Sequence, residues 1–312
     1  MEFTTLEVPA ADGQLLKVGA YPGSGAKLAV LVLHGLYSHM GWYRPLAEAL
    51  VERGGAVYLL DRRGAGLSGG LAGHIDSWRQ IVDDLQRVVA RIRSLHPGAP
   101  VCGLGISLGA AMTVATSLVH EDAFQRHALM SPGLAPAVQL PFMRRIGVVY
   151  SAFARPHVLY ELPFTVEQLC EQGELRESLW SDPLRTRAIT SRFLLEIFRM
   201  QRFVRQHIDR LRTPLLALVA GKDAMIDNEA VLAVLNRARR APVRIEVFPQ
   251  AQHVLTASVP LPDLVGRIWH WFSAPEETLE KRVAIQLVAP EAAAEAAPAA
   301  APPAVPEAGA TW

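Results

Sequence analysis

The segment VCGLGISLGAAMTVA, residues 101–115, carries the clearest structural signal in this chain. Residues 101–104 are apolar or glycine and fit a strand that is buried on both faces, and residues 110–115 continue as a helical run. Between them, residues 105–109 match the pattern G-x-S-x-G. The two glycines suit a turn so sharp that a Cβ at either position would clash. The segment therefore predicts a strand, a tight turn and a helix, with Ser107 at the turn.

The pattern G-x-S-x-G is informative here because of its setting. Alone it is a weak signal, since a chain of this length matches it by chance roughly once in ten cases. Between a strand and a helix, however, it raises the serine hydroxyl above the sheet, and the N-terminus of the following helix favours negative charge there. We therefore interpret Ser107 as a nucleophile. The alternative is a strand-to-helix turn without chemistry.

Further apolar runs predict a sheet around this segment. Residues 27–33, 56–60, 127–130 and 215–219 are typical of buried strands, and the alternating residues 243–248 suit a strand nearer the sheet edge. Helical patterns lie between them, as at residues 77–95, which begin with a predicted capping box of Ser77 and Gln80. Strands that alternate with helices predict an α/β fold with a mostly parallel central sheet flanked by helices.

Two segments break this alternation. Residues 134–211 hold many aromatic residues and long helical patterns but no evident strand, so we predict a helical cap inserted between core strands, over the edge where open α/β sheets bind ligands. The α/β core is then residues 1–133 and 212–273. From residue 288 onward the chain is almost wholly Ala, Pro and Glu, and we expect residues 274–312 to be a disordered tail.

A serine nucleophile needs a base and an acid that orients the base. His253 follows the predicted strand 243–248, and Asp223 follows the strand 215–219. Loops at these strand ends share one rim of a parallel sheet with Ser107, and the order Ser, Asp, His is the one that this fold uses. Asp227 precedes a predicted helix and is better interpreted as an N-cap. Ser107, Asp223 and His253 are therefore the predicted catalytic residues.

The oxyanion of an acyl-transfer intermediate needs hydrogen-bond donors. The backbone N–H of Leu108, after the nucleophile, is one candidate, and that of Leu36, in the loop His34-Gly35-Leu36, is the second. We expect His34 to brace this loop by hydrogen bonds. It is also a candidate for contact with the substrate. In the cap, Phe142 and Phe198 are candidates for an acyl pocket, although ordinary helix packing explains most cap aromatics.

The cap also carries several arginines. They could form a solvated helix face, or they could attract an anionic head group or interface. They include Arg144, Arg145, Arg199, Arg202 and Arg205.

The composition of the chain argues against nucleic-acid-binding, disulfide-rich, zinc-binding and membrane-spanning proteins. The formal net charge is +1 over 312 residues, so no general attraction to nucleic acid is expected. Two cysteines are too few for a disulfide framework, and no zinc motif occurs. The N-terminus lacks the apolar region of a signal peptide, and no run of about 18 apolar residues predicts a membrane span. We expect a cytoplasmic protein that needs neither metal nor organic cofactor, because the chemistry uses only water as second substrate.

With these elements placed, the chain resembles the monoacylglycerol lipase and lysophospholipase branch of the α/β-hydrolases, the serine aminopeptidase S33 type. The resemblance spans roughly residues 3–272. It rests on His34-Gly35 followed by His39, Gly41 and Tyr43, on the loop 61–68, on the elbow 105–109, on Ser181-Asp182-Pro183-Leu184, on Gly221-Lys222-Asp223 and on His253-Val254-Leu255. Ser38, Ala65, Ile106 and Leu108 depart from the usual residues of that branch. We interpret Asp61 and Arg63 as loop-fixing ion-pair partners.

These features lead to one main hypothesis, a hydrolase that cleaves carboxylic esters through an acyl-enzyme. Its expected partner is a small acyl ester such as a monoacylglycerol or a lysophospholipid, with transient lipid-interface contact through the cap. The alternatives are an amidase or aminopeptidase of the same fold, and a non-catalytic protein of this fold that binds a small ligand. The sequence leaves the oligomeric state open.

Overall fold

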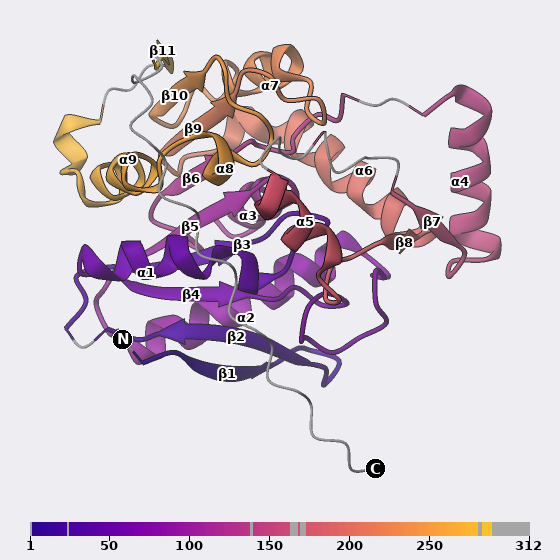
Figure 1. The fold of residues 1–312 in the computed structure, drawn as a ribbon, viewed down its shortest axis with the longest axis horizontal. Coiled ribbons are helices and arrows are strands. Elements are labelled where there is room, and N and C mark those ends of the chain that lie inside the picture. The colour runs from indigo at the N-terminus through magenta and orange to yellow at the C-terminus, as the bar shows by residue number, and fades with distance from the viewer. Residues whose placement is uncertain are drawn as a thin grey trace.

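The computed structural model describes residues 2–23, 25–137, 140–162, 168, 173–279 and 283–288. Within them, a nine-stranded sheet in the order β1-β2-β4-β3-β5-β6-β9-β10-β11 runs through the molecule (Figure 1). Its strands are β1 (Thr4–Pro9), β2 (Leu15–Tyr21), β3 (Ala29–Leu33), β4 (Ala56–Leu60), β5 (Val101–Ile106), β6 (His127–Met130), β9 (Leu215–Ala220), β10 (Val243–Phe248) and β11 (Val283–Leu287). All pairs from β4 to β11 are parallel, which confirms the predicted α/β fold.

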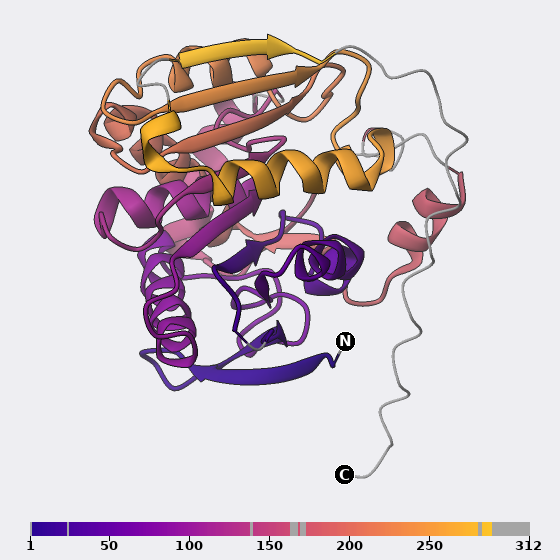
Figure 2. The same ribbon diagram turned by 90° about the vertical axis from the view of Figure 1, so that its left-hand side faces the viewer.

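Helices cover both faces of this sheet. The core helices are α1 (Arg44–Glu52), α2 (Trp78–Leu95), α3 (Leu108–Val119), α7 (Asn228–Leu235), α8 (Leu255–Ser258) and α9 (Leu261–Ser273), with short 3-10 turns η1 (Met40–Tyr43), η3 (Ile208–Arg210) and η4 (Glu276–Thr278). Figure 2 shows α9 lying across one face. Alternate residues of β3 enter opposite cores: Leu31 packs with α2 and α3, and Val32 packs with α1 and α9. All five residues of β3 are buried, because the strand is covered on both sides.

The predicted capping box at the start of α2 is present. The Ser77 side chain accepts the backbone N–H of Arg79, and the Gln80 side chain accepts the backbone N–H of Ser77. Hydrophobic residues on one face of α2, including Ile81 and Leu85, then enter the core. The local sequence signal and the tertiary packing therefore agree on where this helix begins.

Between β6 and β9 the chain forms α4 (Phe142–Ala154), β7 (Leu159–Glu161), α5 (Gly173–Ser181), β8 (Ala188–Thr190) and α6 (Ser191–His207). β7 and β8 pair in an antiparallel two-stranded sheet, so the expectation of a segment without strands is wrong. Three residues per strand are too few to produce a readable alternation. Figure 1 shows α4 projecting away from the central sheet, whereas α6 packs on α3. The domain limits 134 and 211 themselves stay a prediction.

Both ends of the sheet differ from expectation. β1 and β2 form an antiparallel hairpin that we did not predict from the sequence. At the other edge, β11 pairs in parallel with β10, so residues 283–287 are a strand and not part of a disordered tail. Residues 289–312 of the predicted tail, together with Phe164 and Cys170, lie outside the described residues. Among the helices that are described, none combines the length and apolar character needed to cross a membrane.

Candidate active site

Ser107 lies at the turn between β5 and α3, as predicted. Its backbone has φ 52° and ψ −117°, a conformation that L-residues rarely adopt. The flanking glycines permit this turn. A Cβ on Gly109 would lie 2.2 Å from the carbonyl oxygen of Leu33, and one on Gly105 would lie 2.6 Å from the Cα of Ala110. The strained turn is therefore held by backbone atoms on both sides.

A hydrogen-bonded chain joins Ser107 to the predicted base and acid. His253 Nε2 lies 3.0 Å from Ser107 Oγ, and His253 Nδ1 lies 2.7 Å from Asp223 Oδ2. Because a carboxylate only accepts, Nδ1 carries the proton that faces Asp223, and Nε2 is left to accept the Ser107 hydroxyl proton. The side chains of His253 and Asp223 are 6% and 1% exposed. The structure thus brings together all three residues, in the arrangement that general-base activation of a hydroxyl requires.

Backbone donors fix the Asp223 carboxylate. Its Oδ1 accepts the N–H groups of Met225 at 2.9 Å and Ile226 at 3.0 Å, which leaves Oδ2 directed at His253. Asp227 has the other predicted role. Its side chain accepts the N–H of Ala230 at 2.9 Å and caps the N-terminus of α7. The loop after β9 therefore holds two acids with different partners, because Asp223 faces His253 and Asp227 caps α7.

Residues 131–133, directly after β6, form hydrogen bonds to both Ser107 and His253, the predicted nucleophile and base. Ser131, with φ 44°, donates its hydroxyl to the carbonyl oxygen of His253 at 2.6 Å. The N–H of Gly133 donates to the carbonyl oxygen of Ser107 at 2.9 Å. Sequence reasoning missed this segment, although its place after a core strand, at the same rim as the nucleophile, was a usable signal.

The two predicted oxyanion donors lie beside Ser107. Leu108 is the first residue of α3, so its N–H has no partner within the helix, and Leu36 belongs to the loop after β3. Within the described residues, neither N–H donates a hydrogen bond to another protein group. A Cβ on Gly35 would lie 3.2 Å from Ser107 Cβ, so this loop approaches the nucleophile closely. Their role as oxyanion donors stays a prediction.

His34 braces the loop and does not reach the cavity. Its Nε2 accepts the N–H of Arg62 at 3.2 Å, so Nδ1 carries the proton and donates to the carbonyl of Gly35 at 2.7 Å. Burial lowers the pKa of His34 well below its usual value, with a further contribution from the nearby Arg62 guanidinium, and keeps the ring neutral. Both ring nitrogens are occupied. The hydrogen bonds of His34 therefore agree with its predicted role in bracing the loop. They leave no ring nitrogen for a contact with a substrate.

A small cavity opens at Ser107. Its lining is mainly apolar and comes from the loop after β3, η1, the strand ends and the loop of His253. The lining residues are Gly35, Leu36, Tyr37, Ser38, Trp42, Tyr43, Ile106, Ser107, Met130, Met225, His253, Val254, Leu255 and Thr256. Phe142 and Phe198 are not among them. Phe142 is 73% exposed on the projecting helix α4, and Phe198 lies on α6, so the structure does not bring these two rings to the nucleophile.

Asp61 and Arg63 fix loops by separate means. The Asp61 carboxylate accepts the N–H groups of Met40 and Leu67, each at 2.7 Å. Arg63 forms a two-pronged ion pair with Asp84 at 2.6 and 2.7 Å and a further one with Asp12 at 2.8 Å. Arg63 is thus an ion-pair partner as expected. Asp61 is not its partner and acts through backbone donors, because its carboxylate faces the turns at residues 40 and 67.

The part of the chain that the structure describes holds no group of three or more His, Cys, Asp or Glu residues arranged to bind a metal ion. Cys102 is buried in β5, where burial raises its thiol pKa to about 12, so the sulfur remains a protonated, apolar core group.

Comparisons with known proteins give the family and the fold of this chain. The family model for serine aminopeptidase, S33, matches residues 24–258. The human monoglyceride lipase is 25% identical over 263 residues, covering 83% of this chain and 86% of that protein, and the monoacylglycerol lipase of Mycolicibacterium smegmatis is 24% identical over 234 residues, covering 74% and 83%. The crystal structure of Paleococcus ferrophilus monoacylglycerol lipase superposes with a TM-score of 0.73 at 20% identity, covering 87% of this chain and 98% of that one. The chain belongs to the serine aminopeptidase S33 family of α/β-hydrolases.

Proposed function

We propose that this protein hydrolyses carboxylic esters through a covalent acyl-enzyme formed on Ser107. One observation carries the proposal: the continuous hydrogen-bonded chain from Ser107 through His253 to Asp223, at the wall of an apolar cavity. Relatives named monoglyceride lipase, monoacylglycerol lipase and phospholipase support an ester as substrate.

In the proposed acylation, His253 Nε2 takes the Ser107 proton while Oγ attacks the ester carbonyl carbon. Negative charge then develops on the former carbonyl oxygen, where the N–H groups of Leu36 and Leu108 would stabilise it. The imidazolium of His253 is stabilised by Asp223 and gives its proton to the departing alcohol as the carbon–oxygen bond breaks. The acyl group is left on Ser107.

Deacylation repeats these steps with water. His253 Nε2 accepts a proton from the water that attacks the acyl carbonyl, and the proton returns to Ser107 Oγ when the acid leaves. The cavity lining supports an apolar acyl group, since Ile106, Met130, Met225 and Leu255 surround the nucleophile. Monoacylglycerols and lysophospholipids, with one acyl chain and a polar alcohol, fit this chemistry.

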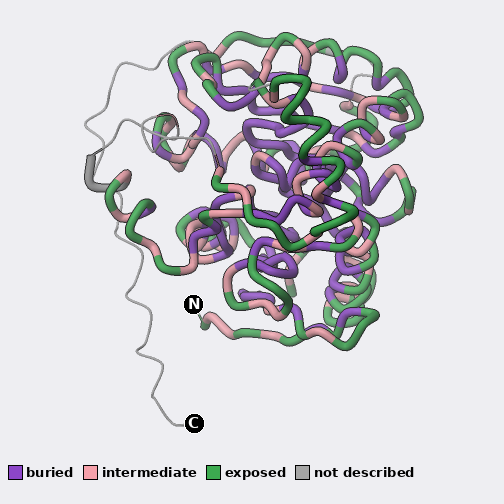
Figure 3. Tube along the Cα trace, turned by 90° about the vertical axis from the view of Figure 1, so that its right-hand side faces the viewer, coloured by how far each residue is buried: buried purple, intermediate pink, exposed green. Residues whose placement is uncertain are grey.

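We further propose that α4 contacts lipid interfaces. It exposes Phe142 at 73%, Met143 at 74%, Tyr150 at 70% and Phe153 at 62%, and its sequence carries no acidic residue. Most of the helix therefore belongs to the exposed class that is drawn green in Figure 3. Arg144 and Arg155 lie on the same helix or at its end, and both are exposed. A helix with bulky apolar side chains and cationic neighbours fits the surface of a bilayer that contains anionic lipid.

Other cap arginines serve the protein itself. Arg199 pairs with the buried Glu196 at 2.7 Å, and Arg205 donates to the carbonyl of Leu134 at 2.8 Å. Arg199 and Arg205 therefore already bind groups of the protein through their guanidinium groups. Arg144 and Arg155 are the better candidates for a contact with anionic lipid.

Turnover of p-nitrophenyl esters of increasing chain length tests the proposed function. We expect hydrolysis that disappears in Ser107→Ala and falls about a thousandfold or more in kcat in Asp223→Asn, because the amide no longer fixes the His253 tautomer. Asp227→Asn is the matched control, since this acid caps α7, and its kcat should change little. Folded protein that neither turns over any ester nor reacts with a fluorophosphonate at Ser107 would refute the proposal. A matching amide panel separates esterase from amidase activity.

A further inference from the structure

The loop that carries Leu36 depends on contacts from the segment between β6 and β9. We call residues 34–39 the oxyanion loop and residues 182–186, which follow α5, the tether. The backbone N–H of Thr186 donates to the carbonyl of Tyr37 at 2.8 Å. Arg62 donates to the carbonyl of Leu36 at 2.8 Å and reaches the Thr186 hydroxyl at 3.4 Å. The backbone immediately after the predicted oxyanion donor is therefore anchored on the tether.

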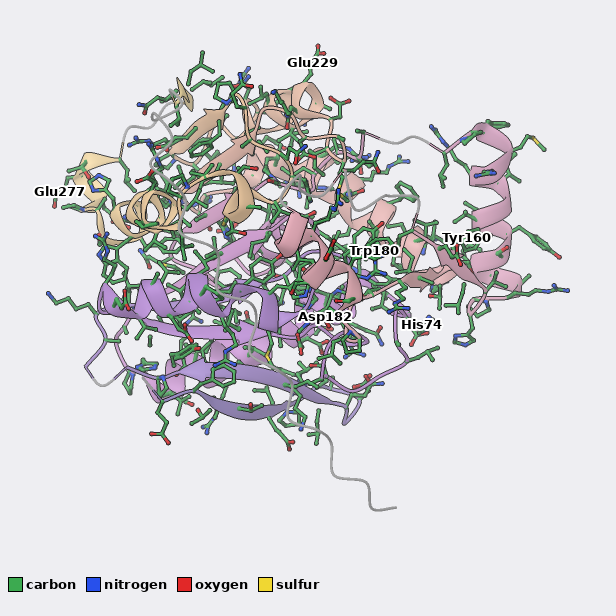
Figure 4. The ribbon with its side chains drawn as sticks, viewed as in Figure 1. His74, Tyr160, Trp180, Asp182, Glu229 and Glu277 are labelled. Atoms are coloured by element: carbon green, nitrogen blue, oxygen red, sulfur yellow. The ribbon has the colours of Figure 1, made fainter. Side chains whose placement is uncertain are left out.

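Asp182 connects the tether to the same region through its side chain. Its Oδ2 accepts hydrogen bonds from His39 Nε2 at 2.7 Å and from Trp42 Nε1 at 2.7 Å. Its Oδ1 accepts the N–H of Leu184 at 2.8 Å, which fixes the carboxylate within the tether. Figure 4 shows Asp182 beside Trp180 at the end of α5. One carboxylate thus joins the tether to both the end of the oxyanion loop and η1.

The hydrogen bonds of His39 define its tautomer. The N–H of Gly41 donates to His39 Nδ1 at 3.1 Å, so Nδ1 is an acceptor and Nε2 carries the proton that faces Asp182. Although burial raises the pKa of the Asp182 carboxyl, the hydrogen bonds from His39 and Trp42 outweigh that effect and keep the pKa below its usual value. The carboxylate is therefore an anion that accepts from both donors at neutral pH.

These contacts matter because they hold the second half of the oxyanion loop, whereas His34 and Arg62 hold its beginning at Gly35 and Leu36. Gly35 lacks a side chain, and the loop must place the Leu36 N–H opposite that of Leu108. Tyr37, Ser38 and Trp42 also line the cavity at Ser107. A shift of the tether would move an oxyanion donor and a cavity wall together.

We propose that Asp182 is a positioning residue for ester hydrolysis, which holds the oxyanion loop in its productive place through His39 and Trp42. This inference rests on the proposed function. Asp182 does not touch Ser107, His253 or the cavity, so its effect is exerted on the transition state through the placement of Leu36. A displaced donor weakens binding of the developing oxyanion more than binding of the neutral ester.

The test compares Asp182→Ala and Asp182→Asn with wild type on one soluble ester. We expect kcat to fall about 10- to 100-fold while KM stays within about threefold. Affinity for a trifluoromethyl ketone, which forms an oxyanion on Ser107, should fall by the same factor as kcat/KM. Asp209→Asn, at an exposed acid of η3 that is remote from the tether in the sequence, is the matched control and should behave as wild type.

Trp42→Phe provides a second arm if an Asp182 variant does not fold, because it removes one hydrogen bond to Asp182 and keeps a ring in the cavity wall. Trp42→Phe should lower kcat by a smaller factor than Asp182→Ala does. In the double variant it should cause no further loss of kcat, because the hydrogen bond between Trp42 and Asp182 is already absent. An unchanged kcat in folded Asp182→Ala overturns the inference, and so does a raised KM with unchanged kcat. Wild-type protein without esterase activity would instead refute the proposed function.

Discussion

The hydroxyl of Ser131 donates a hydrogen bond of 2.6 Å to the carbonyl oxygen of His253, and so ties the end of β6 to the loop after β10. Both residues are buried, and Ser131 adopts a left-handed backbone conformation to make this contact. The imidazole of His253 is aligned from two directions, by Asp223 through its side chain and by Ser131 through its backbone.

Loss of the Ser131 hydroxyl should loosen the His253 loop. We expect Ser131→Ala to lower kcat about tenfold, because the ring spends less time within hydrogen-bond distance of Ser107. Steady-state ester hydrolysis measures this. Ser273→Ala is the control, since that hydroxyl also donates to a backbone carbonyl, of Trp269 at 2.8 Å, but on the exposed end of α9. Equal activity of the two variants would remove the positioning role of Ser131.

The glycines of the fold differ sharply in what an added methyl group would meet. Gly109→Ala should abolish folding or activity, since its Cβ would lie 2.2 Å from a backbone oxygen that cannot withdraw. Gly266→Ala in α9 should raise the free energy of unfolding by roughly 0.5–1 kcal/mol, because its Cβ meets no atom within 4 Å and alanine favours a helix. Urea unfolding compares the two. A folded, active Gly109→Ala protein would contradict the described elbow.

Two buried neutral histidines should make stability depend on pH. Burial lowers the pKa of His127 to about 3 and that of His34 well below its usual value. In the unfolded chain both titrate with a pKa of about 6.5, so as pH falls below that value the unfolded state binds protons that the folded state excludes. The free energy of unfolding is therefore fully retained above about pH 6.5 and decreases below it.

We expect each of these two histidines to account for about 1 kcal/mol of lost stability between pH 7.5 and 5.5. The measurement is urea unfolding at both pH values. His127→Gln should reduce the pH-dependent loss by about 1 kcal/mol, whereas His270→Gln, at an exposed residue of α9, serves as the control. A pH dependence that is unaffected by His127→Gln would show that this ring is protonated in the folded protein.

Binding to vesicles tests the proposed role of α4. Phe142→Ser with Met143→Ser should weaken binding to vesicles of phosphatidylcholine and phosphatidylglycerol about tenfold or more, because two large apolar side chains no longer enter the interface. Arg144→Gln with Arg155→Gln should lower only the preference for anionic over zwitterionic vesicles. Leu71→Ser removes an apolar side chain that is 54% exposed outside α4 and is the control. If all three proteins bind alike, α4 is not the lipid contact.

Sequence patterns predicted the parts of the site that lie at the ends of regular elements. Ser107, Asp223 and His253 each follow a strand with a readable apolar run, so their convergence at one rim followed from the topology of a parallel sheet. Ser131 and Asp182 also lie in or near loops, but their partners are 122 and 140 or more residues away in the chain. The position of Ser131 directly after β6 indicates the rim of the sheet on which it lies, but no local pattern indicates which residues Ser131 and Asp182 bind, because these pairs exist only once the sheet and the intervening segment have assembled.

The strands that we did not predict were missed for a different reason. β7 and β8 have three residues each, and β1 is half-exposed, so none of them carries the apolar signature of a core strand. The prediction that cap aromatic residues line an acyl pocket failed for a related reason. Bulky apolar residues indicate a contact with another apolar group, but their pattern does not distinguish the wall of a pocket from an outer surface. Phe142 is an example, since it is exposed on α4.

The parallel pairing of β11 with β10 has a practical consequence for shortened versions of this protein. Residues 243–247 are matched one for one with residues 283–287, so β11 occupies hydrogen-bonding positions that β10 would otherwise present to solvent. A version cut after Ser273, where the globular pattern of the sequence fades, would convert β10 into a bare sheet border. Such borders recruit strands from neighbouring molecules. Expression designs that retain residue 288 avoid creating this self-association hazard.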